Sequence, residues 1–482
     1  MNNCMKQCSG GGSRMIKNVF LLLIPLFLIL FACKVSGKEP VVAGSFYPAD
    51  KESLQKILQE FLSKVTRVKS PERIIALVSP HAGYIYSGQV AASGYKQLEG
   101  KDINKVILIG PSHHKGFNGA SVYTKGFFKT PLGDVRINEK LAEDLLNEEA
   151  DVKFFPEAFE KEHSLEVQLP FLQTVLKDFT IIPILVGSPS RKTFSHLTSK
   201  ISEILDEKTI IIASTDLSHY HNYEKAKEMD SKVISAIERL SLKDAENLLK
   251  TGEGEFCGGY SLIIALEAAR MAGANIGATF KYANSGDVTG DKGRVVGYAS
   301  IGLFKEPLTD EEKKELIALA RDAIREYVTK NKIIDKEIKN PKFKTDGAVF
   351  VTIKEKGQLR GCIGHIQPYM PLYKSVIENA ISAATEDPRF MPVTKDELKD
   401  LDIEITILSP LLPVRNVNNI IIGKHGLVIR KYNHSGILLP QVPVEFGWDR
   451  ETFLKQICYK AGLPSDAWKD AELYYFTAEI IH

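Results

Sequence analysis

The chain has 482 residues, which is too long for one ordinary domain and predicts about two to four. Hydrophobic residues make up 44% and charged residues 25%, a balance that excludes long disordered stretches. The 62 basic and 60 acidic residues leave a net charge of +2, which excludes a nucleic-acid-binding protein that relies on a basic surface, so we expect no nucleic-acid partner.

Residues 15–33 predict an export signal. Lys17 is followed by the apolar residues 19–32, the length of a signal-peptide core and short for a membrane-spanning helix. This core ends in Leu-Phe-Ala-Cys33, which resembles the lipobox of bacterial lipoproteins, although Phe31 is bulkier than the usual residue. We therefore expect an exported lipoprotein on the extracytoplasmic face of a bacterial membrane, attached only by a lipid on Cys33. A plain secretory signal or an uncleaved anchor is the alternative.

The spacing of the cysteines and the first 14 residues predict no additional structural or functional site. Six cysteines are spread along the sequence without paired C-x-x-C sets, so neither a structural zinc site nor a disulfide framework is predicted. Translation could begin at Met1 or Met15, and residues 1–14 receive no function. The leader is assigned to residues 1–33.

Residues 38–305 predict an α/β domain with a largely parallel sheet. Short runs that are apolar on both faces alternate with amphipathic stretches, as expected of buried parallel strands and their covering helices. The predicted strands are Ile74–Ser79, Lys105–Gly110, Thr180–Val186 and Thr209–Ser214. The predicted helices are Lys51–Val65, Glu139–Glu148, Ser190–Leu205, Tyr223–Leu240 and Ser261–Met271.

Residues 306–482 predict a smaller α+β domain. Thr309 and Glu312 form the pattern of a capping box that opens a helix through about Lys330. Hairpin-like runs and one further helix follow: Ala348–Lys354 with Gln358–Ile363, Asp402–Leu408, Ile420–Arg430 with Gly436–Leu439, and the helix Thr452–Ala461.

Three predicted strands of the first domain end in metal-binding residue types. The strands are followed by His81, by His113 and His114, and by Asp216 and His219. Ligands of open α/β sheets bind at the carboxyl ends of the strands, where these side chains would converge. His and Asp at one sheet edge form a plausible ligand set for a divalent metal, although a single histidine after a strand is more often structural.

Cys257 is a further candidate ligand. It precedes two glycines and the start of a predicted helix, where the helix dipole would stabilise a thiolate and the glycines would permit close backbone approach.

Seven segments of residues 41–303 resemble the Memo family, the B component of the prokaryotic AmmeMemoRadiSam system. They are VVAGSFYPAD, PHAGYIYSG, ILIGPSHH, EHSLEVQLPF, IIPILVG, STDLSHY and FCGGYSLIIAL. The family is similar in fold to the class III extradiol dioxygenases, which hold non-haem iron. The resemblance implies His81, His113 and Cys257 as metal ligands, with Asp216 and His219 in the same pocket as candidate catalytic residues.

Three other residues are assigned to this pocket. His114 would point away from the metal or support a ligand. His163 and Glu166 of EHSLE are spaced as on one helix face, and either line the pocket or form a structural pair that caps a helix or links strands.

The third ligand separates this sequence from ring-cleaving dioxygenases. Those enzymes use two histidines and a carboxylate, whereas Cys257 is softer and also suits copper or zinc. Iron is the first expectation and copper or zinc follow, and ring cleavage is not assigned. Asp216 could orient a histidine or act as a general base.

Residues 310–480 resemble the AMMECR family, the A component of the same system. The matching segments are LRGCIGHI, AATEDPRFMPVTKDEL, LDIEITILSP, GKHGLVIR and GILLPQVPVEFGWDRETFLKQICYKAGL. The resemblance implies a radical-SAM protein as a partner, which is not on this chain because no C-x-x-x-C-x-x-C motif occurs.

Cys362 is the candidate reactive residue of this second domain. Arg360 would depress the pKa of its thiol and make it nucleophilic or redox-active. The alternative is a small buried cysteine between glycines, and Cys458 is expected in the core.

Two function classes follow. The first is a metal-dependent oxidoreductase that acts on an unknown small-molecule or protein substrate. The second is a non-catalytic metal-binding or scaffold protein that handles iron or copper at the cell surface. An enzyme needs open coordination positions and a nearby acid or base, whereas a carrier surrounds its metal with more ligands.

Overall fold

The computed structural model describes residues 37–68, 73–414 and 416–482, and the predicted leader with Cys33 lies outside them. In these ranges, no helix combines the length and the apolar character needed to cross a membrane.

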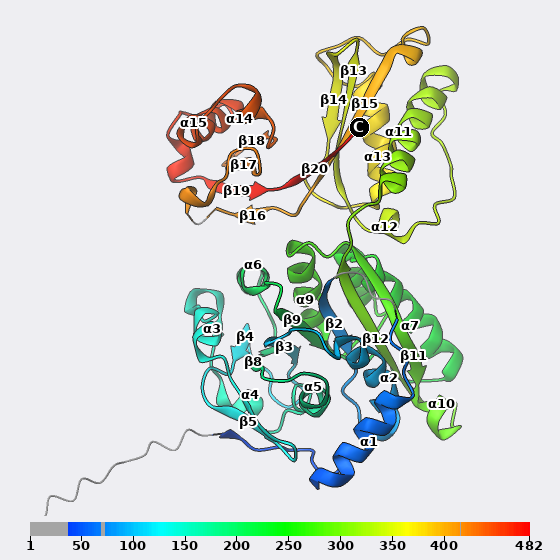
Figure 1. Ribbon diagram of the computed structural model, residues 1–482, viewed down its shortest axis with the longest axis vertical. Helices are drawn as coiled ribbons and strands as arrows, with labels where there is room; N and C mark the ends of the chain where they lie inside the picture. The colour runs from blue at the N-terminus through cyan, green and yellow to red at the C-terminus, as the bar shows by residue number, and fades with distance from the viewer. Residues whose placement is uncertain (1–36, 69–72, 415) are drawn as a thin grey trace, which may run out of the picture. The chain divides into compact units, whose positions relative to one another are not determined.

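The first half of the described chain is built on a nine-stranded sheet, shown in the lower part of Figure 1. Its four central strands run parallel in the order β2-β9-β3-β8 and are almost entirely buried. They span Arg73–Ser79 (β2), Thr209–Ser214 (β9), Lys105–Pro111 (β3) and Thr180–Val186 (β8). The predicted strands and the α/β fold with parallel central strands are therefore confirmed. Runs that are apolar on both faces need a layer of helices on each side of the sheet.

The outer strands of this sheet are mostly antiparallel. β12 pairs antiparallel with β2, β10 and β11, and β4 pairs antiparallel with β8 and parallel with β7. They span Ala120–Val122 (β4), Val152–Lys153 (β7), His219–His221 (β10), Ile276–Asn284 (β11) and Val295–Lys305 (β12). A separate small sheet consists of Gly37–Lys38 (β1), Phe127–Thr130 (β5) and Gly133–Arg136 (β6).

Helices cover both faces of the large sheet. One face carries Lys51–Ser63 (α1), Tyr84–Tyr95 (α2) and Leu169–Val175 (α5). The other carries Arg191–Ile204 (α6), Tyr223–Glu238 (α7), Leu242–Thr251 (α8) and Gly259–Met271 (α9). Three short helices are Glu139–Asp144 (α3), Pro156–Phe159 (α4) and Ser285–Thr289 (α10).

One predicted helix ends early. The stretch from Glu139 was expected to continue to Glu148, but α3 stops at Asp144. The Asn147 side chain accepts a hydrogen bond from the amide of Ala150 and starts a separate 3₁₀ turn at Glu148. An asparagine that bonds its own neighbouring backbone competes with helix continuation.

The second half begins with the helix Asp310–Lys330 (α11). The predicted capping box is present, because Thr309 and Glu312 exchange side-chain to backbone hydrogen bonds. Together with Leu372–Thr385 (α13), α11 packs on an antiparallel sheet of order β14-β13-β15-β20, as Figure 1 shows. These strands span Ala348–Glu355 (β13), Gln358–Gly364 (β14), Leu401–Leu408 (β15) and Ala478–Ile481 (β20).

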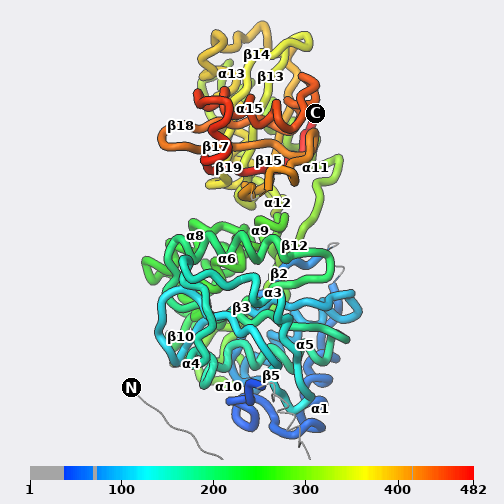
Figure 2. Tube along the Cα trace, turned by 90° about the vertical axis from the view of Figure 1, so that its left-hand side faces the viewer, coloured from blue at the N-terminus to red at the C-terminus, as the bar shows by residue number. Residues whose placement is uncertain are grey.

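A second antiparallel sheet completes this half and packs against the helix Arg450–Lys460 (α15), as the tube of Figure 2 shows. It consists of Leu412–Pro413 (β16), Glu472–Phe476 (β19), Gly426–Lys431 (β17) and His434–Leu438 (β18). Two short helices are Pro341–Lys344 (α12) and Val442–Glu445 (α14). The strand predicted from Ile420 begins only at Gly426, because the amide of His425 bonds the carbonyl of Ile421 in a turn.

Candidate metal centre

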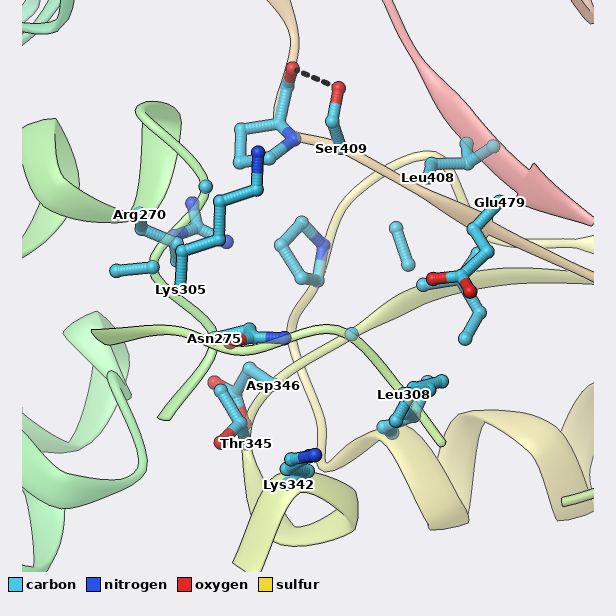
Figure 3. Close-up of a pocket in the computed structure, with 18 of the residues that line it drawn as sticks. Arg270, Asn275, Lys305, Leu308, Lys342, Thr345, Asp346, Leu408, Ser409 and Glu479 are labelled. Atoms are coloured by element: carbon cyan, nitrogen blue, oxygen red, sulfur yellow. Dashed lines mark hydrogen bonds between the residues drawn. The ribbon is translucent and has the colours of Figure 1, made fainter. Parts of the chain in front are cut away.

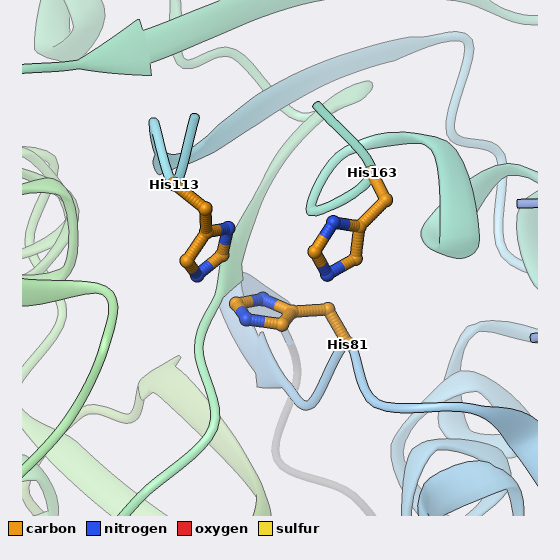
Figure 4. A group of neighbouring side chains, drawn as sticks. All are labelled: His81, His113 and His163. Carbon is orange, nitrogen blue, oxygen red and sulfur yellow. The ribbon is translucent and has the colours of Figure 1, made fainter. Parts of the chain in front are cut away.

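Three histidine side chains meet beyond the carboxyl ends of the central strands. His81 follows β2, His113 follows β3, and His163 lies in the loop before the 3₁₀ turn Glu166–Gln168. One nitrogen from each ring lies within 4.8 Å of the others. Figure 4 shows the three rings facing one another. The three histidines thus form a candidate site for a divalent metal ion.

The tautomer of His81 follows from its hydrogen bonds. The Ser214 hydroxyl donates to the carbonyl of Ser164 at 2.6 Å and accepts from the Gln168 amide at 2.9 Å. Since its one proton is used, Ser214 must accept from His81 Nδ1, which lies 2.9 Å away. The Nε2 atom of His81 is therefore unprotonated and presents a lone pair, as a metal ligand requires.

His113 is oriented by the buried carboxylate of Glu162. His113 Nδ1 lies 2.9 Å from Glu162 Oε1 and donates to it, which leaves Nε2 free. Glu162 also accepts hydrogen bonds from the amides of His113, His163 and Ser164. Carboxylates that bond the far nitrogen of a ligating histidine fix its orientation and raise its basicity.

Burial and Glu162 set the protonation of the cluster. Burial lowers the pKa of His81 and of His163, so both rings are neutral at pH 7. Burial also acts to lower the pKa of His113, but the hydrogen bond and charge of Glu162 outweigh it and raise that pKa. Burial opposes ionisation of Glu162, but the bonds from His113 outweigh it and lower the Glu162 pKa to about 2. The carboxylate is thus ionised at neutral pH.

Cys257 lies beside this cluster. Its Sγ is 3.1 Å from His81 Nε2 and accepts a hydrogen bond from the amide of Asp216. Gly258 makes this approach possible, because a Cβ there would lie 2.7 Å from the Cβ of Thr215. Two ligand atoms on one tetrahedral metal stand roughly 3.5 Å apart, so a small shift would let both atoms bind.

The predicted stabilisation of the Cys257 thiolate by the helix dipole is wrong. Burial, followed by the charge of Asp216, raises the pKa of the thiol well above its usual value. In the metal-free protein Cys257 is therefore a neutral thiol that can donate to His81 Nε2. A metal would have to displace this proton to gain a thiolate ligand.

Asp216 and His219 lie next to the cluster. Asp216 Oδ1 accepts the amide of His81 at 2.8 Å, and its Oδ2 lies 4.0 Å from His81 Nε2. Burial raises the pKa of Asp216 to about 7. His219 Nδ1 donates to the carbonyl of Leu217 at 2.8 Å, so its Nε2 is unprotonated, and burial lowers its pKa. Asp216 can therefore exchange protons near neutral pH, and His219 offers an unprotonated acceptor nitrogen.

His163 and Glu166 do not share a helix face, as their spacing had suggested. His163 is in a loop and its ring stacks on that of His113, with centroids 5.1 Å apart. Glu166 instead binds the N-terminal segment, accepting hydrogen bonds from the amides of Val41 and Val42 and from the Tyr47 hydroxyl. His163 therefore belongs to the cluster, whereas Glu166 links its own segment to the N-terminal segment.

We expect Glu166→Gln to lower the free energy of unfolding by about 3 kcal/mol, measured by urea denaturation. The carboxylate is 1% exposed and pairs with the buried ammonium of Lys38 at 3.5 Å. A glutamine would leave this ammonium unpaired and would turn its own amide donors toward backbone amides. Glu39→Gln, which removes an exposed partner of Lys129, should leave the stability almost unchanged. Equal stabilities of the two variants would contradict this role.

The residues that orient the histidines were not predicted from the sequence. Glu162, Ser214 and Gln168 are all buried at the site. Glu162 immediately precedes His163 in EHSLE, so the motif contained the signal, but nothing in the spacing related this carboxylate to His113. His114 is exposed at the rim, with its ring 6.1 Å from that of His163.

The donor set fits a transition metal. Three imidazoles and a neighbouring thiol suit iron, copper or zinc, whereas Mg²⁺ and Ca²⁺ prefer oxygen ligands. The side chain of His81 is 3% exposed, that of His163 16% and that of His113 28%. The cluster is therefore closed at His81 and accessible from the side of His113.

Cys362 of the second half lies in a different environment from the predicted one. Arg360 does not contact its thiol, because the guanidinium pairs with Glu397 at 2.8 Å. The Thr352 hydroxyl donates to Cys362 Sγ at 3.3 Å, and Asp387, paired with Arg389, accepts the amide of Cys362. Burial raises the pKa of the thiol, so the predicted depression by Arg360 is wrong.

Iodoacetamide is expected to label Cys362 slowly near neutral pH, because its thiol is protonated. Cys458, which is fully buried in α15 as predicted, should react more slowly still. Mass spectrometry of tryptic peptides after timed labelling of the folded protein measures both rates. Labelling of Cys362 as fast as that of a free low-pKa thiol would contradict the structural environment.

A separate pocket involves none of the predicted site residues. Figure 3 shows it, with Asn275, Lys305, Asp346 and Glu479 among the residues that line it. These residues include neither a histidine nor a cysteine.

Two protein families match successive parts of the chain. The family described as Memo-like protein matches residues 38–302, and the family described as AMMECR1 matches residues 317–481. A MEMO1 family protein of Methanosarcina mazei is 36% identical over 268 residues, covering 55% of this chain and 98% of that protein. One of Aquifex aeolicus is 38% identical over 264 residues, covering 54% and 97%. The crystal structure of the uncharacterized protein PH0010 from Pyrococcus horikoshii is 41% identical, covers 36% of this chain and 92% of its own, and aligns with a TM-score of 0.35.

Proposed function

We propose that this protein is a metal-dependent oxidoreductase. The premise is that the chain belongs to the Memo-like protein family and carries an AMMECR1 domain. Its metal would be a divalent ion, with iron as the first candidate and copper or zinc after it. His81 and His113 would hold the ion together with Cys257 or His163. The substrate would be a small organic molecule or a group on a protein.

One observation carries this proposal. Hydrogen bonds at Nδ1 orient His81 and His113 so that Nε2 is the atom left for a metal, and the third ring completes a cluster that stays accessible beside His113. A bound ion would act as a Lewis acid or a redox centre. Three protein ligands leave coordination positions open, as a catalytic site requires and a closed structural site does not.

Asp216 and His219 support an enzyme over a carrier. A catalytic site needs a group that can take or give a proton near neutral pH, and the pKa of Asp216 is raised to about 7 by burial. His219 offers an unprotonated Nε2 nearby. Asp216 would also position the His81 segment through its bond to the His81 amide.

The second candidate function is a non-catalytic protein that holds iron or copper at the cell surface. It is favoured by the closeness of Cys257 Sγ to His81 Nε2, since a fourth ligand of this kind could close the coordination shell. A closed shell would leave no position for a substrate.

Nitric oxide distinguishes the two functions. The purified chain is loaded with Fe(II) without oxygen and exposed to nitric oxide, which binds only at an open coordination position. An enzyme site should give the electron paramagnetic resonance signal of an iron–nitrosyl complex, and Asp216→Asn should keep it with an unchanged iron content. The absence of this signal in iron-loaded protein would reject the enzyme and favour the carrier.

The localisation and the partner belong to the same proposal. The apolar segment that precedes Cys33 supports export as a lipoprotein. A radical-SAM protein is the partner implied by the resemblance to the AmmeMemoRadiSam system. We expect intact-mass spectrometry of membrane-extracted protein to find a mature chain that begins at a diacylated Cys33, because two acyl chains give stable anchoring. A mature chain that starts elsewhere or lacks lipid would contradict the anchor.

A further inference from the structure

Tyr298 is a buried polar side chain beside the metal centre that the proposed mechanism does not use. It lies on β12 and is 2% exposed. Among the residues that the structure describes, none forms a hydrogen bond with its hydroxyl. The hydroxyl oxygen is also not among the fully enclosed polar atoms of these residues, so it retains access to water or a ligand. A buried phenol normally finds a partner, so this hydroxyl needs an explanation.

The strand pairing brings Tyr298 to the edge where the histidines gather. β12 pairs antiparallel with β2, and the ladder ends where Ile301 faces Val78. Tyr298 and His81 each lie three residues beyond that pair, by their numbers. Beyond the end of this ladder, the backbone of Gly297 exchanges hydrogen bonds with Leu217 and Ser218, while the opposite edge of β12 pairs with β11. Tyr298 therefore lies on the strand that neighbours both the end of β2, which leads to His81, and the segment that carries Asp216 and His219.

The direction of the Tyr298 side chain follows from its neighbours on the strand. A Cβ on Gly297 would lie 1.9 Å from Asp230 of α7, so position 297 faces α7. Side chains alternate along a strand, which turns Tyr298 to the opposite face. After burial, which is the main cause, the charges of Asp216, Tyr86 and Tyr220 raise the pKa of Tyr298. The hydroxyl therefore stays protonated and can donate a hydrogen bond.

We propose that Tyr298 is a substrate-contacting residue, whose hydroxyl donates a hydrogen bond to an oxygen of the ligand that binds at the metal centre. The inference rests on the proposed function, because it assumes a ligand next to the metal. The ligand class is an organic molecule with a carbonyl, carboxylate or similar oxygen acceptor. Tyr86 and Tyr220, whose charges act on the pKa of Tyr298, are exposed, and their rings could cover the apolar body of such a molecule. The Arg294 guanidinium lies 5.0 Å from the Tyr220 ring.

Acetohydroxamate is a suitable probe because it binds metals through oxygen and offers oxygen acceptors to neighbours. The full chain is loaded with Co(II), and the change of visible absorption is titrated with acetohydroxamate. Tyr298→Phe should keep the Co(II) content and weaken hydroxamate binding about tenfold, the effect of one lost hydrogen bond to a bound ligand. Its melting temperature should not fall, because the hydroxyl has no partner in the described protein. Tyr223→Phe, whose hydroxyl bonds Asp287 on the surface, is the matched control and should bind the probe like the wild type.

Each other outcome overturns a defined part of the idea. Equal hydroxamate affinity of Tyr298→Phe and the wild type would reject the role of Tyr298 while leaving the proposed function standing. Loss of Co(II) from Tyr298→Phe would assign the hydroxyl to metal binding and also reject substrate contact. A wild-type protein that holds Co(II) but does not bind acetohydroxamate would reject the open site and the inference together.

Discussion

Replacing His81 with Ala is expected to abolish stoichiometric metal binding while the protein stays folded. His81 contributes an unprotonated Nε2 fixed by Ser214, and both ligand sets considered for this centre contain it. The fold should survive, because the backbone amide at position 81 donates its hydrogen bond to Asp216 and an alanine keeps this amide. Elemental analysis of purified variants, with circular dichroism for folding, measures both effects.

Alanine replacements of the other candidate residues identify the remaining metal ligands. His113→Ala should also lose the metal, and His114→Ala is its matched control, because the exposed neighbouring ring should have a much smaller effect. Cys257→Ala is expected to abolish binding if the thiol is the third ligand. His163→Ala would do so if the third imidazole takes that place. Full metal content in both His81→Ala and Cys257→Ala would show that the proposed centre is wrong.

The sequence could predict the strands that support the centre because their signal is local. β2, β3, β8 and β9 are apolar on both faces, and such runs can only become buried parallel strands. Since each chain segment leaves its strand at the same sheet edge, the clustering of His81 and His113 followed from topology alone.

Tertiary contacts account for what the sequence could not predict. The partner of His113 is Glu162, which is 49 residues away in the chain, and no spacing relates the two. The pKa of Cys257 depends on burial, which opposes the thiolate more strongly than a helix terminus favours it. A local contact explains one further difference, because the segment after Ile420 is apolar enough for a strand but forms a turn that ends at His425.

Glu162→Gln is expected to weaken metal binding by about 10- to 100-fold, the usual effect of removing a carboxylate that orients a ligating histidine. Glu162 Oε1 accepts from His113 Nδ1 and from the amides of His163 and Ser164, while Oε2 accepts the amide of His113. A glutamine keeps one acceptor oxygen but points an NH₂ group at the remaining donors. Two segments that carry candidate ligands would therefore lose their common anchor.

The measurement should be repeated at several pH values, because Glu162 raises the pKa of His113 and so sets how strongly protons compete with the metal in the wild type. Glu160→Gln, an exposed change two residues away, is the control and should bind metal like the wild type.

Glu162→Gln should also lower the free energy of unfolding by an amount that depends on pH. Since the folded pKa of Glu162 is lowered to about 2, its contribution is complete above about pH 4.3, the unfolded value, and disappears as the pH falls through 2. Unfolding curves of wild type and Glu162→Gln that differ equally at pH 7 and pH 2 would contradict an ionised Glu162 as the anchor of His113.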